Sequence, residues 1–145
     1  MPNRRTYDHL FNGKFAIEIE GVTQGAFVAC DGLEARVDVV TFADAEVNGT
    51  LERKRPGRAR YANIVLRRGQ TTNSDLWDWF KAVLDGKVER KSGSIIVCGD
   101  DGSEIMRYNF FEGWPCRWKS LTLNTDTPGT LVEELEIAVE KIEHA

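Results

Sequence analysis

Residues 63–80 read NIVLRRGQTTNSDLWDWF and join two kinds of local structure. A run with strand-like alternation ends in Arg67, Arg68 and Gly69, and small polar residues then lead into a segment with helical spacing. A helix N-terminus with two nearby arginines is suited to binding an anion. The stretch lacks the glycine and lysine spacing of a P-loop, so the favoured interpretation is a glycine-enabled turn whose arginines pair with acidic side chains.

The segment after this joint predicts a helix over about residues 74–85. At 100° per residue, one broad apolar face collects Leu76, Trp77, Trp79, Phe80, Val83 and Leu84. We expect this face to pack on a sheet, with Leu76, Trp77, Phe80 and Val83 as its packing residues. Thr72 with Asp75 resembles a capping box, and Asn73 or Ser74 could also cap the helix. Gly86 suits the position just past the helix end.

Most of the remaining chain alternates apolar and polar residues with period two. This pattern predicts half-buried strands in residues 14–20, 34–40, 61–68 and 104–111, and SIIVC, residues 94–98, is the run that precedes the last of these. The Asp-Gly of GDDGS, residues 99–103, is typical of a hairpin turn. Residues 132–142 fit a strand and a helix equally well. The prediction is a single, mainly β domain over residues 1–145, a small antiparallel β-barrel or sandwich of about eight strands with one flanking helix.

Composition excludes several classes of protein. The net charge of −4 argues against a general nucleic-acid binder, which carries a basic excess. No apolar run approaches the length that spans a bilayer, and the N-terminus has no apolar signal region. Three widely spaced cysteines fit a reducing compartment better than a disulfide framework. We therefore expect a chain that folds in the cytoplasm and neither binds nucleic acid specifically nor inserts stably into a membrane.

Motifs for catalysis are absent from the sequence. The two histidines, His9 and His144, lie near opposite termini, and Cys30, Cys98 and Cys116 form no CxxC pair. There is no GxSxG nucleophile elbow. We expect no enzyme activity, no metal and no cofactor.

Residues 51–60, LERKRPGRAR, concentrate positive charge in an otherwise acidic chain. The basic residues are Arg53, Lys54, Arg55, Arg58 and Arg60. Pro56-Gly57 predicts a break in regular structure and hence a loop. The simplest interpretation is a solvated basic loop, and the functional alternative is a loop that meets an acidic surface on another protein or another copy.

Several stretches together resemble one family, the inner tube protein of contractile injection systems, which is related to the tail tube protein of contractile-tailed phages. They are GKFAIEIEGVTQGAFVACDGLEARVDVVTF, the basic KRPG, IVLRRGQTTNSDLWDW, SGSIIVCGDDGSEIMRYNFFEGWPCRW and the terminal ELEIAVEKIE. They occur in the family's order and cover nearly the whole chain. The resemblance implies a small β-barrel or sandwich with a helix on its flank, and it makes residues 132–142 a strand.

The resemblance also implies a function. Copies are expected to form hexameric rings that stack into a hollow tube, which encloses cargo inside a contractile sheath and is driven through a target envelope. Partners would be the chain itself, sheath and baseplate or spike proteins, and luminal cargo. The expected interface residues are Val47, Asn48, Arg53, Lys54, Arg55, Arg58, Arg60, Arg67 and Arg68. The candidates to face the lumen are Glu18, Glu20, Asp38 and Asn63.

Three alternatives remain open at this point. One is a paralogous ring at the baseplate end that initiates the tube, and another is a secreted ring protein of the type VI kind. The third, and least favoured, is a barrel that binds a small ligand. For the tube subunit we expect assembly in the cytoplasm and then a place in a phage tail or in a released or fired particle.

Overall fold

The structure is a computed structural model that describes residues 15–20, 22, 27–44, 51–69, 74–99, 101–120 and 132–145. These residues form nine strands and one helix. The strands are β1 (Phe15–Ile19), β2 (Phe27–Asp31), β3 (Ala35–Asp44), β4 (Leu51–Tyr61), β5 (Ile64–Gly69), β6 (Lys91–Cys98), β7 (Glu104–Lys119), β8 (Val132–Ala138) and β9 (Lys141–His144). The helix is α1, Asp75–Leu84.

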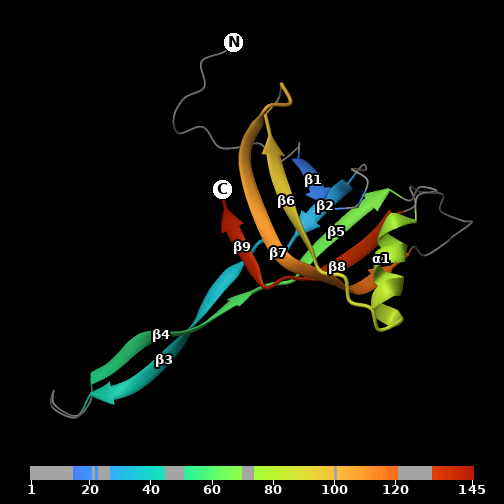
Figure 1. Cartoon of the computed structure of the whole chain (residues 1–145). Helices are drawn as coiled ribbons and strands as arrows, with labels where there is room; N and C mark the ends of the chain where they lie inside the picture. The colour runs from blue at the N-terminus through green and yellow to red at the C-terminus, as the bar shows by residue number, and fades with distance from the viewer. Residues whose placement is uncertain are drawn as a thin grey trace, which may run out of the picture.

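Seven strands form one antiparallel sheet in the order β1-β6-β7-β8-β5-β2, and β9 also pairs with β7. The long strand β7 joins the two halves of this sheet. Its residues up to Gly113 pair with β6, and those from Trp114 pair with β8. Glu112, close to this junction, has a φ of 54°, and the strand bends strongly along its length (Figure 1). One strand therefore turns the sheet around the core.

The core lies on one face of this curved sheet. Side chains of a strand alternate between its two faces, so every second one points toward the core. On this face Ile17 pairs with Ile95, and Leu66 pairs with Leu135. The buried cluster consists of Ile17, Ile19, Ile64, Leu66, Leu76, Trp79, Ile95, Phe110, Leu135 and Ile137. The predicted alternation of β1 and β5 is confirmed by this burial.

Helix α1 covers one end of the core and contacts β7. Its packing face is nearly the predicted one, except that Trp79 is more buried than the expected Trp77, Phe80 and Val83. Leu76 is 1% exposed, as its place in the predicted face requires. Ser74 occupies the N-cap position but makes no side-chain cap hydrogen bond.

The helix ends as the sequence predicts. Gly86 adopts a φ of 82°, its N–H donates to the Val83 carbonyl, and the Lys87 N–H donates to the Ala82 carbonyl. These two bonds define a Schellman motif, which satisfies the last carbonyls of the helix.

Four predictions about the sheet need refinement. The mainly β class with one flanking helix is confirmed, but there are nine strands rather than about eight. The end strands β1 and β2 do not pair in the described part of the chain, so the sheet is open rather than a closed barrel. Residues 132–142 are extended, yet Val139 and Glu140 separate β8 from β9. Gly69 is the last residue of β5 and not part of a turn with positive φ.

The predicted basic loop is wrong as a description of residues 51–60. These residues form β4, which pairs with β3 in a separate two-stranded sheet that projects from the body (Figure 1). The register shifts between Val37 and Val39, where Val39 pairs with Pro56. A bulge of this kind, on an edge strand, accommodates a proline that has no N–H to donate. Pro56-Gly57 therefore distorts the strand without ending it.

Candidate assembly surfaces

The arginines of the opening stretch point to opposite faces of β5. Arg68 lies on the core face, where its side chain is 2% exposed. Its Nε donates to Glu133 Oε1 at 3.0 Å, and its NH2 group donates to Asp75 at the start of α1. Trp118 Nε1 donates to the second oxygen of Glu133 at 2.9 Å. The cluster thus ties β5, β7, β8 and α1 together.

This cluster decides the question of an anion site. The carboxylate of Asp75 accepts a hydrogen bond from a backbone N–H of the first helical turn, that of Leu76, at 2.8 Å and also neutralises Arg68. Burial disfavours the charged guanidinium, but Asp75 and Glu133 outweigh that effect and raise the pKa of Arg68. The cation is therefore neutralised within the subunit. The sequence suggested that Arg68 either pairs with acidic side chains of its own chain or contacts another copy. The structure supports the pairing within the subunit.

Arg67 lies on the opposite, outward face and begins a ladder of paired charges. Its Nε donates to Glu134 Oε1 at 2.8 Å, and Arg117 donates to Glu134 Oε2 at 2.9 Å. Arg117 also donates to Glu136 Oε1 at 3.4 Å, and Asn63 donates to Glu136 Oε2 at 3.0 Å. The ladder crosses β5, β8 and β7 on the face away from the core, so the predicted residues Asn63 and Arg67 do lie together.

The pKa values of the ladder's acids follow from these contacts. The hydrogen bond from Arg67 is the main cause that lowers the pKa of Glu134, and that from Asn63 is the main cause for Glu136. The partners Glu134, Glu136 and Arg117 were not among the predicted site residues. Their signal was present in the sequence, because Glu134 and Glu136 alternate with Leu135 and Ile137 in the terminal segment.

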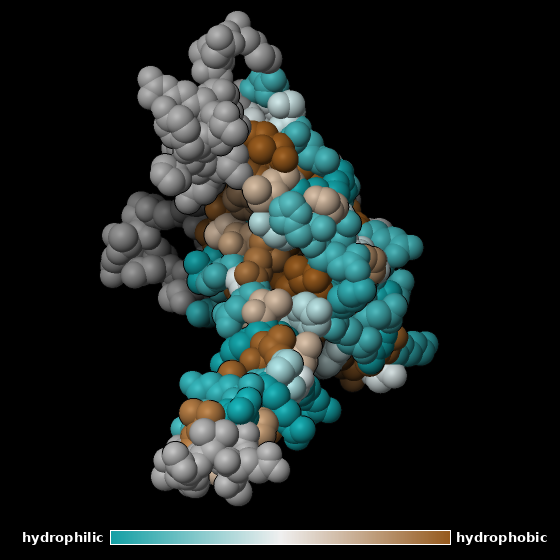
Figure 2. All heavy atoms as spheres, turned by 90° about the vertical axis from the view of Figure 1, so that its left-hand side faces the viewer, coloured by the Kyte–Doolittle hydropathy of each residue, from teal (hydrophilic) through white to brown (hydrophobic). Residues whose placement is uncertain are grey.

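The β3–β4 hairpin is exposed on both faces. On one face, Val37 is 51% and Val39 63% exposed, and they lie opposite Ala59 and Pro56. Figure 2 shows hydrophobic residues among polar ones on the surface of this projection.

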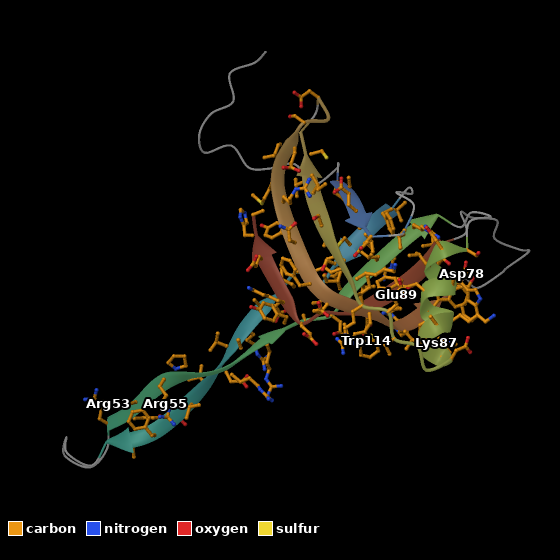
Figure 3. The ribbon with its side chains drawn as sticks, viewed as in Figure 1. Arg53, Arg55, Asp78, Lys87, Glu89 and Trp114 are labelled. Carbon is orange, nitrogen blue, oxygen red and sulfur yellow. The ribbon has the colours of Figure 1, made fainter. Side chains whose placement is uncertain are left out.

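The other face of the hairpin carries much of the basic charge. Val40 pairs with Arg55, and Phe42 with Arg53. The guanidinium of Arg55 lies 5.9 Å from the centroid of the Phe42 ring, within the range of a cation–π contact. Figure 3 shows Arg53 and Arg55 toward the far end of the hairpin.

The candidate lumen residues do not share one surface. Asp38 lies on the hairpin, where Arg60 Nε donates to it at 2.8 Å and lowers its pKa. Asn63 belongs to the ladder, while Glu18 and Glu20 line a groove beside β1, β6 and β7.

Some residues singled out from the sequence lie outside the described part of the chain. They are the expected interface residues Val47 and Asn48, the helix-cap candidates Thr72 and Asn73, and the histidine His9. Lys54 and Arg58 are exposed on β4. These basic positions therefore keep their predicted place at the surface, on a strand instead of a loop.

The described residues hold no grouping of histidine, cysteine and acidic side chains that suits a metal ion. Burial, followed by the nearby charge of Asp31, raises the pKa of the Cys30 thiol to about 11. Burial and Glu136 likewise raise the pKa of Cys116. A raised pKa disfavours the reactive thiolate. Within the described part of the chain, no helix has the length and apolar character needed to cross a membrane.

Comparison with known families identifies this arrangement. The family described as T4-like virus tail tube protein gp19 matches residues 12–143, nearly the full chain. The chain belongs to this family of tail tube proteins. No curated protein sequence gives a significant match.

Solved structures share the fold of this tail tube protein. A chain from the PVC sheath–tube complex of an extracellular contractile injection system has a TM-score of 0.85 and 22% identity, covering 97% of this chain and 93% of that one. A chain from the anti-feeding prophage cap has a TM-score of 0.85 and 19% identity, covering 99% and 95%. Hcp1 from Flavobacterium johnsoniae has a TM-score of 0.57 and 18% identity, covering 90% and 93%.

Proposed function

We propose that this tail tube protein is the repeated subunit of the inner tube of a contractile injection system or phage tail. Copies close into hexameric rings, and the rings stack into a hollow tube. The observation that carries this proposal is the projecting hairpin, whose Val39 is 63% and Phe42 45% exposed. An isolated two-stranded hairpin is marginally stable in water, so these faces need covering by other chains.

The free edges of the curved sheet support ring closure. Among the described residues, β2 pairs only with β5, and the Trp114–Lys119 part of β7 pairs only with β8. These two segments form the opposite edges of the half of the sheet that contains β7, β8, β5 and β2. Unpaired edges at opposite ends favour head-to-tail addition of further strands. A head-to-tail interface whose rotation closes produces a ring. The Arg67 to Asn63 ladder lies between these edges on the face away from the core, and we propose that this face lines the lumen.

The partners follow from this assembly. A tube of stacked rings presents an outer wall to a sheath, one end to a baseplate and an interior to cargo. The solved structures with this fold include a sheath–tube complex, a terminator and a baseplate, which supports sheath and baseplate contacts here. We propose that subunits assemble in the cytoplasm and then function within the finished particle, without catalysis.

Negative-stain microscopy of the purified protein tests the proposal. We expect rings with a central hole and stacked tubes. The removal of residues 36–60, with a short turn joining Ala35 to Tyr61, is expected to leave a folded subunit that no longer stacks. A wild-type protein that remains monomeric at high concentration would contradict the proposal.

One alternative, a tube-initiating ring at the baseplate end, also has support in the fold. A chain from the anti-feeding prophage baseplate matches with a TM-score of 0.80 and 16% identity. The copy number in intact particles separates the two functions. The tube subunit is present in many rings, whereas an initiator is present in one.

A further inference from the structure

A groove of about 450 Å³ lies on the body of the subunit. The residues that line it include the apolar Ile19, Val22, Phe110 and Phe111 and the acidic Glu18 and Glu20. Ile19 and Phe110 are only 6% and 1% exposed, so Val22 and Phe111 are the more accessible of the apolar residues. Glu18 has a long contact with Arg107, at 3.5 Å, while the same arginine binds Glu104 more closely. Among the described residues, the groove therefore combines apolar residues with two carboxylates whose ion pairing is limited to the long contact of Glu18 with Arg107.

One face of the hairpin has the complementary character. Phe42 and Val40 alternate with Thr41 and so share a face, which Arg53 and Arg55 complete from the paired strand. An aromatic ring beside arginines is typical of residues that anchor protein interfaces. In the described part of the chain, the hairpin projects away from the body, so this face lies apart from the β1, β6 and β7 groove of its own subunit (Figures 1 and 3).

Other acidic side chains suit these arginines less well. Glu134 is held by both Arg67 and Arg117, and Glu104 is held by Arg107. A new partner would have to displace those cations. Within the described part of the chain, only the long Arg107 contact of Glu18 would have to be exchanged, and both carboxylates belong to a groove that also contains apolar residues.

We propose that the Val40, Phe42, Arg53 and Arg55 face of one hairpin docks in the Glu18–Glu20 groove of a second copy. The inference rests on the proposed tube function and names the receiving surface. Phe42 packs against the apolar lining, and the two arginines pair with the two carboxylates. Glu18 and Glu20 then belong to a contact between copies and not to the lumen, where sequence reasoning placed them.

Exchange of the charges across this contact tests the docking. Arg53→Glu with Arg55→Glu, and separately Glu18→Lys with Glu20→Lys, are each expected to lose stacked tubes while remaining folded by circular dichroism. The combined four-site variant restores the wild-type net charge of −4 and is expected to restore the tubes. Lys54 lies on the opposite hairpin face, so Lys54→Glu is the matched control and should not rescue the Glu18→Lys, Glu20→Lys variant.

Cross-linking gives a second readout that does not depend on charge. Leu51 shares the docking face and Ser92 lines the groove, so Leu51→Cys with Ser92→Cys leaves the anchor residues intact. A short bismaleimide should convert assembled tubes of this variant into a ladder of covalent multimers on denaturing gels. Each single cysteine variant is the control for the three native cysteines.

Two results would overturn the docking proposal while leaving the tube function intact. One is normal tubes from either charge-reversed pair. The other is wild-type assembly with no cross-linked ladder from the double cysteine variant and no rescue by the four-site variant. Absence of rings and tubes from the wild-type protein would instead contradict the proposed function itself.

Discussion

The body of the subunit and its β3–β4 hairpin differ in how far their side chains are buried or paired within one chain. In the body, the buried Arg68 meets Glu133 and Asp75, and no buried side-chain nitrogen or oxygen in the described residues lacks a hydrogen-bond partner. In the hairpin, large apolar residues such as Val39 and Phe42 face solvent. The body contains the interactions that stabilise one chain, whereas the hairpin exposes apolar groups for which we propose partners on other chains.

This difference predicts two classes of variant. Substitutions in the body should lower the free energy of unfolding of the isolated subunit and affect assembly only through folding. Substitutions in the hairpin should leave that free energy nearly unchanged and affect assembly directly. The predictions below run from the largest expected loss of subunit stability to the smallest.

Removal of the buried cation has the largest expected effect. Arg68→Met leaves the carboxylates of Asp75 and Glu133 without their cation, which should destabilise the isolated subunit by about 3–5 kcal/mol in urea unfolding. The neighbouring Arg67 has a side chain that is 56% exposed, so Arg67→Met is the matched control, with an expected loss of at most about 1 kcal/mol. Equal losses in the two variants would show that the buried cluster does not stabilise the body.

A glycine between β2 and β3 is expected to come next. Gly32 has a φ of 94°, and a Cβ added there would lie 2.0 Å from the Asn63 carbonyl oxygen. Gly32→Ala should therefore cost about 2–4 kcal/mol, from backbone strain and from displacement of the chain before β5. Gly86 has a similar φ of 82° but open space around it, so Gly86→Ala should cost about 1–2 kcal/mol. A smaller loss at Gly32 than at Gly86 would rule out the steric part of this explanation.

The same contrast explains which features the sequence could predict. Strand alternation and helix spacing report which side chains face a core, so the burial of Ile64, Leu66 and Leu76 followed from local pattern. The side-chain period also puts Arg68 on the core face of β5. Its partners Glu133 and Asp75 come from distant or separate elements, and local pattern contains no information on which strands become neighbours.

The hairpin was misassigned for a related reason. A proline and a glycine predict a break because they weaken a regular strand in the interior of a sheet. In a projecting pair with few neighbours, a bulge at Pro56 is tolerated, and the strand continues from Leu51 to Tyr61. The groove that contains Glu18 could not be predicted either, because it depends on how β1, β6 and β7 pack together.

The charge ladder should contribute a smaller, pH-dependent effect. The pKa of Glu134 lies below its ordinary value of 4.5 in the folded subunit, so its pairing stabilises the fold above that pH and the contribution is lost as pH falls through the folded pKa. Arg117→Met should lower the free energy of unfolding only slightly at neutral pH, because Arg117 is solvent-exposed and water screens its ion pairs. In urea unfolding, the difference from wild type should shrink as the pH is lowered below 4.5 and Glu134 becomes protonated in the folded subunit. A difference that stays constant with pH would mean that Arg117 stabilises by packing and not by charge.

Substitution of the apolar hairpin face should change subunit stability least and assembly most. Val37 and Val39 are already exposed in the single chain, so Val37→Ser with Val39→Ser removes almost no buried surface from the body. The unfolding free energy of the isolated subunit should stay within about 0.5 kcal/mol of wild type. Tubes should nevertheless be lost under the microscope, because the substituted face no longer presents apolar surface to a neighbouring copy. Val88 is 50% exposed beyond the end of α1, and Val88→Ser is the control expected to change neither property. Unaltered tubes from the double variant would mean that this hairpin face remains in solvent after assembly, and the distinction between body and hairpin would then hold only for the basic face.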